Sequence, residues 1–175
     1  MPATDPPQAE NQPKEMEDFQ LTREGTHTIE DLFAKLRGSY SFFSEMSQQE
    51  LVWFLRLCSR RSYEAGEVIF QEGEIGDCFF LIVFGEVTIT RKDAAVAKLR
   101  DGNCFGEMAV LERAPRNATA TATGKTLVFC VERDILTNVS PSLGFKVAAG
   151  LARDLSQKLR EADKKIKGRS ARAKA

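Results

Sequence analysis

The middle of the chain, residues 62–131, alternates short apolar runs with glycines, and this pattern restricts the fold more than any other feature. The runs occupy residues 68–70, 78–84, 87–90, 95–99, 117–121 and 127–131, and glycines stand at positions 66, 73, 76, 85 and 102. Short runs of this length, with turn residues between them, are typical of β-strands in an antiparallel sandwich or barrel. The sequence therefore predicts a mainly β fold of the jelly-roll type, with helices on either side of it in the chain.

Two helices are expected before the strands. Thr28 can cap a helix that stops at Gly38, and Ser47 with Glu50 three residues later forms a capping box for a second helix. Between the two helices, three large apolar side chains form a hydrophobic plug: Phe42, Phe43 and Met46.

After the strands, residues 133–138 predict a short helix, and Pro141 precedes a long one. The apolar residues of the long helix recur every three or four positions, at Ala148, Leu151, Leu155, Leu159, Ala162 and Ile166. Such spacing gives a helix one continuous apolar seam. The seam must face another surface, and an ordinary helix packed on its own domain is one explanation of it.

The densest signal lies at residues 105–121, which read FGEMAVLERAPRNATAT. A short helix that opens at Gly106 leaves its first amide N–H groups free to face an anion such as phosphate. About six helical residues advance the backbone by about 9 Å, so a strand returning after Pro115 can bring Arg116 to the same small ligand that Glu107 reaches. The alternative is a plain Glu–Arg ion pair at a helix end, which stabilises little when it is exposed.

This stretch resembles the nucleotide-binding cassette of the cyclic nucleotide-binding domain family. The family pattern is F-G-E, a hydrophobic residue, A, a hydrophobic residue and L, followed by a spacer and then P-R-x-A-[T/S]. Segments 65–67, 72–73, 76–77, 79–82 and 85–87 match the family in the same order, so the resemblance covers about residues 32–166. It implies a barrel with N-terminal helices, a short phosphate-binding helix and a long C-terminal lid helix.

The resemblance implies that the ligand is cAMP, or else cGMP, and that no other cofactor is needed. Arg116 is expected to pair with the phosphate, and Glu107 to accept the ribose 2′-hydroxyl. The long helix closes over the purine in the family. The ligand-binding set that we assign is Phe105, Gly106, Glu107, Met108, Ala109, Arg116, Asn117, Ala118, Val96, Ala97, Leu155, Lys158 and Leu159.

Base specificity stays open on sequence grounds because of Asn117. Family members with Thr directly after the phosphate arginine often favour cGMP, whereas Ala or Ser is common in cAMP binders. An asparagine amide both donates and accepts hydrogen bonds, so it can serve either purine. We favour cAMP because it is the more common ligand of the family.

Charge is balanced overall but not at the two ends of the chain. Residues 1–26 have a formal charge of −4 and are expected to form a disordered acidic arm, whereas residues from Arg160 onward carry +5. The expected domain is 27–166, with helices in 28–60, a barrel in 61–132 and C-terminal helices in 133–166, followed by a basic tail in 167–175. Nine residues after Ile166 are too few for a helix-turn-helix, so no DNA binding is expected.

Other classes of protein are disfavoured by what the sequence lacks. The only histidine, His27, precedes the first predicted helix, so a metal-dependent enzyme of the cupin type and a Ser-His or Cys-His nucleophile pair are both excluded. The four cysteines stand singly, as reduced core thiols do, and no apolar run is long enough to insert into a membrane. These features favour a non-enzymatic protein of the cytoplasm.

The sequence thus predicts a sensor that binds a cyclic nucleotide and repositions its C-terminal helix to signal to an effector protein, which the sequence does not name. Homodimerisation through the same helix is a further expectation. The alternative is a degenerate domain that keeps the fold as a protein-interaction module and binds no nucleotide. Intact Gly106, Glu107, Arg116 and Ala118 argue against that alternative.

Overall fold

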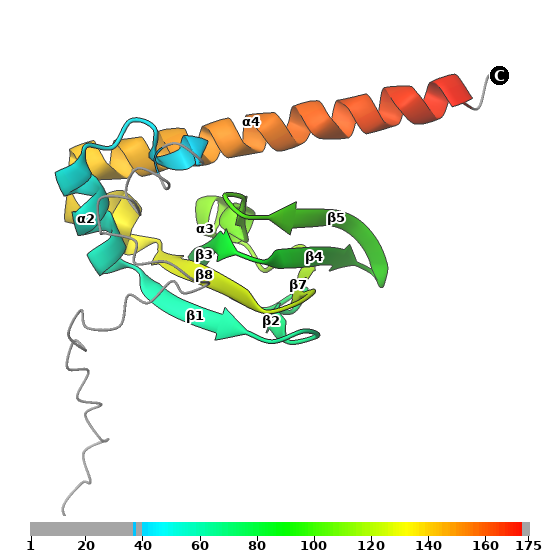
Figure 1. Ribbon diagram of the computed structural model, residues 1–175, viewed down its shortest axis with the longest axis horizontal. Coiled ribbons are helices and arrows are strands. Elements are labelled where there is room, and N and C mark those ends of the chain that lie inside the picture. The colour runs from blue at the N-terminus through cyan, green and yellow to red at the C-terminus, as the bar shows by residue number, and fades with distance from the viewer. Residues whose placement is uncertain (1–36, 38–39, 173–175) are drawn as a thin grey trace, which may run out of the picture.

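A computed structural model describes residues 37 and 40–172 of the chain. Two four-stranded antiparallel sheets form a barrel, with helices at one end and a long C-terminal helix along one side (Figure 1). One sheet has the order β1-β8-β3-β6 and the other the order β2-β7-β4-β5. The strands are β1 (Ser59–Tyr63), β2 (Val68–Phe70), β3 (Cys78–Phe84), β4 (Glu86–Arg91), β5 (Ala94–Arg100), β6 (Cys104–Phe105), β7 (Thr119–Ala122) and β8 (Thr126–Glu132). The predicted jelly-roll class is confirmed.

Strand β3 divides the hydrophobic core into two parts, because successive side chains of a strand point to opposite faces. Phe79, Leu81 and Val83 pack against the helices, in one cluster with the plug residues of the N-terminal segment. Phe80 and Ile82 face the other sheet and pack inside the barrel. A strand covered on both faces needs apolar residues at every position, which explains the unbroken run in residues 79–83.

The helix before the barrel begins as the sequence predicts. Helix α2 (Gln48–Leu57) starts at a capping box, in which Glu50 N–H donates to Ser47 Oγ at 3.2 Å and Ser47 N–H donates to the Glu50 carboxylate at 2.8 Å. A 3₁₀ turn, η2 (Ser41–Phe43), precedes it. The plug is confirmed, since Phe42, Phe43 and Met46 are at most 2% exposed. The helix predicted from Thr28 to Gly38 lies almost wholly outside the described residues.

The C-terminal helix is longer than the sequence pattern suggested. After a π-helical turn, η3 (Ile135–Val139), helix α4 runs over Pro141–Arg172, beyond the predicted seam's last residue. Its first half packs on the domain through a stripe of residues four apart, Leu143, Val147 and Leu151, all at most 1% exposed.

The predicted seam of α4 is only partly correct. Ala148 is exposed rather than buried, because the packed stripe lies one position earlier in the helix. Leu155 is half-buried, and Leu159 and Ile166 are 66% and 62% exposed. This outer half of α4 projects beyond the barrel (Figure 1).

Candidate functional site

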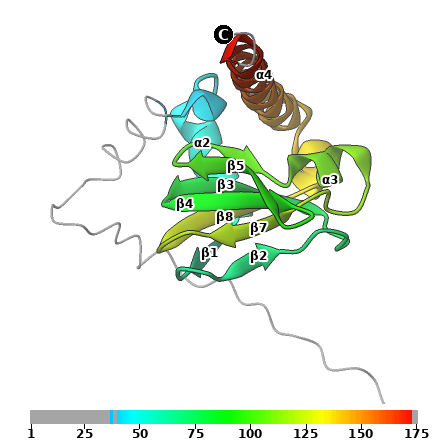
Figure 2. The same cartoon turned by 90° about the vertical axis from the view of Figure 1, so that its right-hand side faces the viewer.

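The cassette forms a strand, a short helix and a return strand, as the sequence predicts. Gly106 follows β6 with a φ of 77°, a left-handed conformation that favours glycine, and it is the N-cap of helix α3 (Glu107–Glu112). The chain then turns at Arg113, whose φ is 54°, and passes through Arg116 into β7. Helix α3 lies at the side of the barrel beneath α4, as both views show (Figures 1 and 2).

Arg116 is buried with 5% of its surface exposed, and its guanidinium has no acidic partner in the part of the chain that the structure describes. Nη1 donates to the carbonyl of Gly106 at 2.7 Å and Nη2 to the carbonyl of Cys78 at 2.6 Å. The guanidinium carbon lies 4.3 Å from the centre of the Phe70 ring. Nε is buried and has no hydrogen-bond acceptor among the described residues. The side chain is therefore a buried cation with one N–H donor, at Nε, that has no acceptor among the described residues.

The segment 71–76 fixes the position of Arg116. The Arg116 N–H donates to the carbonyl of Glu74 at 2.8 Å, and its carbonyl accepts from Gly73 N–H at 2.7 Å. A Cβ atom added to Gly76 would lie 2.5 Å from Nη2 of Arg116, so only glycine lets the guanidinium lie here. Nothing in the sequence pattern indicated that this segment supports Arg116.

Three stacked aromatic rings form the floor beneath Arg116. The rings of Phe80 and Phe105 are 5.1 Å apart, and that of Phe70 lies 5.7 and 5.8 Å from them. The face of an aromatic ring attracts a cation, and burial strengthens this attraction. Phe105, which was predicted to bind the ligand, is 2% exposed and belongs to this floor.

Glu107 is also 5% exposed, but its carboxylate has a cation beside it. Lys158 Nζ, from α4, donates to Glu107 Oε1 at 2.9 Å, and it also lies 2.6 Å from Asp154 Oδ2. Burial by itself would lower the pKa of Lys158, but the carboxylates of Glu107 and Asp154 outweigh burial and raise that pKa above its ordinary value. Lys158 is therefore firmly cationic at neutral pH.

The plain Glu–Arg ion pair that the sequence left open as an alternative does not form between Glu107 and Arg116. Glu107 pairs with α4, and Arg116 binds backbone carbonyls and an aromatic face instead. The two opposite charges of the cassette are thus held apart by different parts of the fold.

The other predicted residues of the cassette differ in exposure. Ala109 and Ala118 are 3% and 7% exposed, and their small side chains let the backbone pack closely around the two charges. Met108 is 41% exposed, and its Sδ accepts from Asn117 Nδ2 at 3.1 Å. Asn117 is exposed, so its amide is accessible at the surface of the site.

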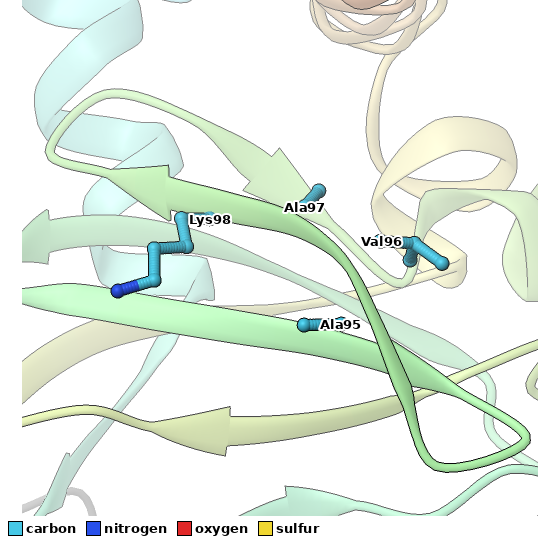
Figure 3. A pocket seen from close by; sticks show the side chains of 4 residues that line it. All are labelled: Ala95, Val96, Ala97 and Lys98. Carbon is cyan, nitrogen blue, oxygen red and sulfur yellow. The ribbon is translucent and has the colours of Figure 1, made fainter.

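Val96 and Ala97 line an open hollow of about 330 Å³ together with Ala95 and Lys98 (Figure 3). All four residues come from β5, which pairs with β4 alone and forms the edge of its sheet. The volume of this hollow is at the lower end for a small-molecule site, and a hollow lined by one strand alone cannot enclose a ligand.

The three residues predicted on the lid helix differ in their positions. Lys158 lies against Glu107, Leu155 is half-buried, and Leu159 is 66% exposed. The structure therefore brings Lys158 to the predicted ribose end of the site, whereas the sequence assigned it to the purine.

Sequence reasoning missed several residues of the site: Phe70, Phe80, Cys78 and Asp154. Only Asp154 had a usable signal, since residues four apart on a helix lie side by side and Asp154 precedes Lys158 at that spacing. In the part of the chain that the structure covers, no group of three or more metal-binding side chains occurs. None of the helices described there is long and apolar enough to span a membrane.

Comparison with known proteins identifies the class of domain that this fold and site define. Residues 60–140 match the family described as the cyclic nucleotide-binding domain. The chain is 32% identical over 133 residues to the cyclic AMP receptor protein of Thermus thermophilus, covering 73% of this chain and 61% of that protein. It is 24% identical over 144 residues to a cGMP-dependent protein kinase of Caenorhabditis briggsae, covering 82% of this chain but only 19% of the kinase.

A solved structure agrees with these relatives. The crystal structure of a cyclic nucleotide-binding domain from Methylobacillus flagellatus matches with a TM-score of 0.69 and 25% identity, covering 77% of this chain and 80% of that one. Residues 60–140 of the chain therefore belong to the cyclic nucleotide-binding domain family. The chain spans about a fifth of the kinase and three fifths of the receptor protein.

Proposed function

We propose that this protein is a sensor that binds a cyclic nucleotide, cAMP or cGMP, and transmits the binding event through α4 to an effector protein. It performs no catalysis in this proposal. In this proposal Arg116 takes the phosphate and Glu107 the ribose, and the long helix contacts Glu107 directly through Lys158.

The observation that carries the proposal is the uncompensated charge of Arg116. A buried guanidinium is costly unless an anion or several acceptors neutralise it. Here two carbonyls and an aromatic face hold it, Nε has no acceptor, and no carboxylate of the described chain is within ion-pair distance. A phosphate matches a guanidinium in fork geometry. We infer that the exocyclic phosphate oxygens of the nucleotide supply the missing anion.

Glu107 supports the same assignment from the other end of the ligand. It lies directly after Gly106, whose carbonyl Arg116 binds, so the carboxylate and the guanidinium flank one stretch of backbone. A carboxylate would repel phosphate, whereas it accepts a hydrogen bond from a sugar hydroxyl. The pair therefore suits a small ligand with a phosphate on one side and a hydroxyl on the other.

Signal output is proposed to run through α4, because Lys158 and Asp154 connect this helix to the cassette. A ligand that contacts Glu107 changes the surroundings of Lys158, and the outer half of α4 exposes Leu159 and Ile166 for a partner. We propose an effector protein, or a second copy of this chain, as that partner. Free thiols at all four cysteines are consistent with action in the cytoplasm.

The choice of purine follows from Asn117 in this proposal. The relatives include a receptor named for cyclic AMP and a kinase named for cGMP, so both nucleotides are candidates. We favour cAMP. The exposed amide of Asn117 is the group whose replacement should change the preference between the two bases.

The proposal is tested by isothermal titration of the purified chain, freed of any carried-through nucleotide, against cAMP and cGMP in parallel. We expect a Kd of about 1 µM or lower for one of them, or about 8 kcal/mol of binding free energy. In Arg116→Lys the charge remains but the planar fork is lost, so we expect binding at least about tenfold weaker.

The matched control is Arg113→Lys, which makes the same replacement at an exposed arginine of the same loop. Its affinity should equal that of the unmodified protein. Absence of binding to both nucleotides would reject the sensor and favour a domain that acts only as a protein-interaction module.

A further inference from the structure

Lys158 is held by three oxygen atoms from two other elements and its own helix. Its Nζ donates to the carbonyl of Cys104 at 2.6 Å and to Glu107 Oε1 at 2.9 Å, and it lies 2.6 Å from Asp154 Oδ2. An ammonium group has three N–H donors, so these three oxygens match its capacity. The side chain is about a quarter exposed, and this arrangement ties α4 to β6 and α3.

Asp154 adds a second link to the same stretch of backbone. Its Oδ1 accepts from the N–H of Cys104 at 3.5 Å, so Asp154 and Lys158 bracket the peptide groups of one residue. Residues four apart on a helix lie next to each other, which brings both side chains to Cys104 together. We call Cys104, Glu107, Asp154 and Lys158 the α4 clamp.

The clamp places Lys158, rather than another cation, beside the carboxylate of Glu107. A carboxylate with 5% exposure needs a positive charge or several donors to stay ionised. The cassette contains another cation, Arg116, which binds the carbonyl of Gly106, the residue before Glu107. An ion pair between them would neutralise both charges and remove the phosphate partner. Lys158 provides the positive charge instead.

We propose that Lys158 is a positioning residue of the nucleotide site, which with Asp154 keeps Glu107 apart from Arg116 and oriented to accept the ribose hydroxyl. Lys158 engages Oε1, and a carboxylate can accept about four hydrogen bonds, so capacity for the ligand remains. The same contacts couple ribose recognition to α4. This inference rests on the proposed function, because the hydroxyl belongs to the proposed ligand.

A 3′,5′-cyclic nucleotide has a single free ribose hydroxyl, at the 2′ position, and this provides a specific probe. Titrations with cAMP and 2′-deoxy-cAMP measure how much of the affinity depends on that hydroxyl. A hydrogen bond to a charged group should give the unmodified chain at least about tenfold tighter binding of cAMP. In Lys158→Met the advantage should fall to about threefold or less, and Lys158→Arg should restore most of it.

The matched control is Lys164→Met, which removes an exposed lysine from the same helix and should leave the advantage unchanged. A role in helix docking alone would weaken both nucleotides by the same factor. Equal weakening of cAMP and 2′-deoxy-cAMP in Lys158→Met would therefore overturn the inference.

A measurement without ligand separates this inference from the proposed function. The groups that face Lys158 are Glu107 from α3, Asp154 from α4, and the carbonyl and thiol of Cys104 from β6. Because the Glu107 carboxylate raises the pKa of Lys158, that pKa, followed by NMR, should fall in Glu107→Gln. An unchanged pKa would reject the clamp even if cAMP binds. A lower pKa in a chain that binds no nucleotide would support the clamp and reject the sensor.

Discussion

Arg116 and Glu107 are equally buried, each with 5% of its surface exposed, yet the fold treats their charges in opposite ways. Glu107 receives a counterion from 51 residues further along the chain, on a different element. Arg116 receives two carbonyls, an aromatic face and no carboxylate of the described chain. The carboxylate of Glu107 already has a counterion, whereas the guanidinium of Arg116 has none among the described residues. This difference supports the proposal that the anion of a ligand binds at Arg116.

The comparison also separates affinity from signalling. The Arg116 end is attached to the barrel, through β3, Gly106 and the segment 71–76, which are parts of one packed body. The Glu107 end is attached to α4, in whose outer half Leu159 and Ile166 are largely exposed. We therefore expect changes at Arg116 to act mainly on binding, and changes at Glu107 to act on both binding and the helix.

The largest expected effect is on nucleotide affinity. Arg116→Ala removes the phosphate's charge-assisted hydrogen bonds and should weaken cAMP binding by at least about a hundredfold, or about 3 kcal/mol. Glu107→Ala removes a partner of one hydroxyl and should weaken it by about tenfold. Isothermal titration of both variants measures the two effects. The reverse order would show that the carboxylate end, not the guanidinium end, dominates binding.

Without ligand, the loss of unfolding free energy should have the opposite order, larger for a change at Glu107 than for one at Arg116. Glu107→Gln leaves Lys158 with one carboxylate instead of two and should cost about 2 kcal/mol of unfolding free energy. Arg116→Met keeps the apolar contact with Phe70 and removes an uncompensated buried charge, so it should cost less than about 1 kcal/mol. Urea unfolding followed by circular dichroism tests both values. A larger loss in Arg116→Met would mean that the protein neutralises the guanidinium without a ligand.

The smallest expected effect is on the unfolding free energy and concerns a second ion pair of α4, between Lys146 and Glu50. Lys146 binds the Glu50 carboxylate of α2 at 2.7 Å, and hydrogen bonds from Lys146 and Ser47 lower the pKa of Glu50 to about 2. Because the pKa is depressed on folding, this pair stabilises the protein above about pH 4.5 and loses its contribution as the pH falls towards 2.

The measurement is the unfolding free energy of the unmodified chain and Lys146→Met between pH 6 and pH 2. The difference should shrink as the pH falls, and NMR should place the pKa of Glu50 closer to its ordinary value in the variant. A difference that is constant across this range would contradict the assignment of the low pKa to Lys146.

Much of the fold could be predicted because local patterns there agree with the tertiary structure. The buried strand β3 and the capping box at Ser47 correspond to elements with the expected bounds or starts. Strand β1 could not be found, because Ser59–Tyr63 is an edge strand whose polar side chains face solvent. Strand β6 is only two residues long. The predicted buried face of α4 was wrong at Ala148, because the alanines of this helix have little apolar surface and do not define a buried face.

The site was predictable where chemistry is concentrated in one stretch, and not where it depends on long-range contacts. Glu107 and Arg116 are recognisable because they share a cassette with glycine and alanine around them. Nothing local to Phe70 or Cys78 indicates that they support Arg116, because folding brings them there from other strands. Lys158 was predicted as a residue that contacts the base, and helix phase alone could not show that its side chain lies beside Glu107.

We propose above that Arg116 binds the anion of the ligand, and NMR of arginine side chains can observe this contact at the guanidinium itself. Three arginine Nε atoms are buried without an acceptor in the described chain: those of Arg116, Arg133 and Arg153. When cAMP is added, the Nε–H resonance of Arg116 should move strongly, as it gains a phosphate oxygen, while those of Arg133 and Arg153 should stay nearly unchanged. An Arg116 resonance that does not move at saturating cAMP would contradict the account.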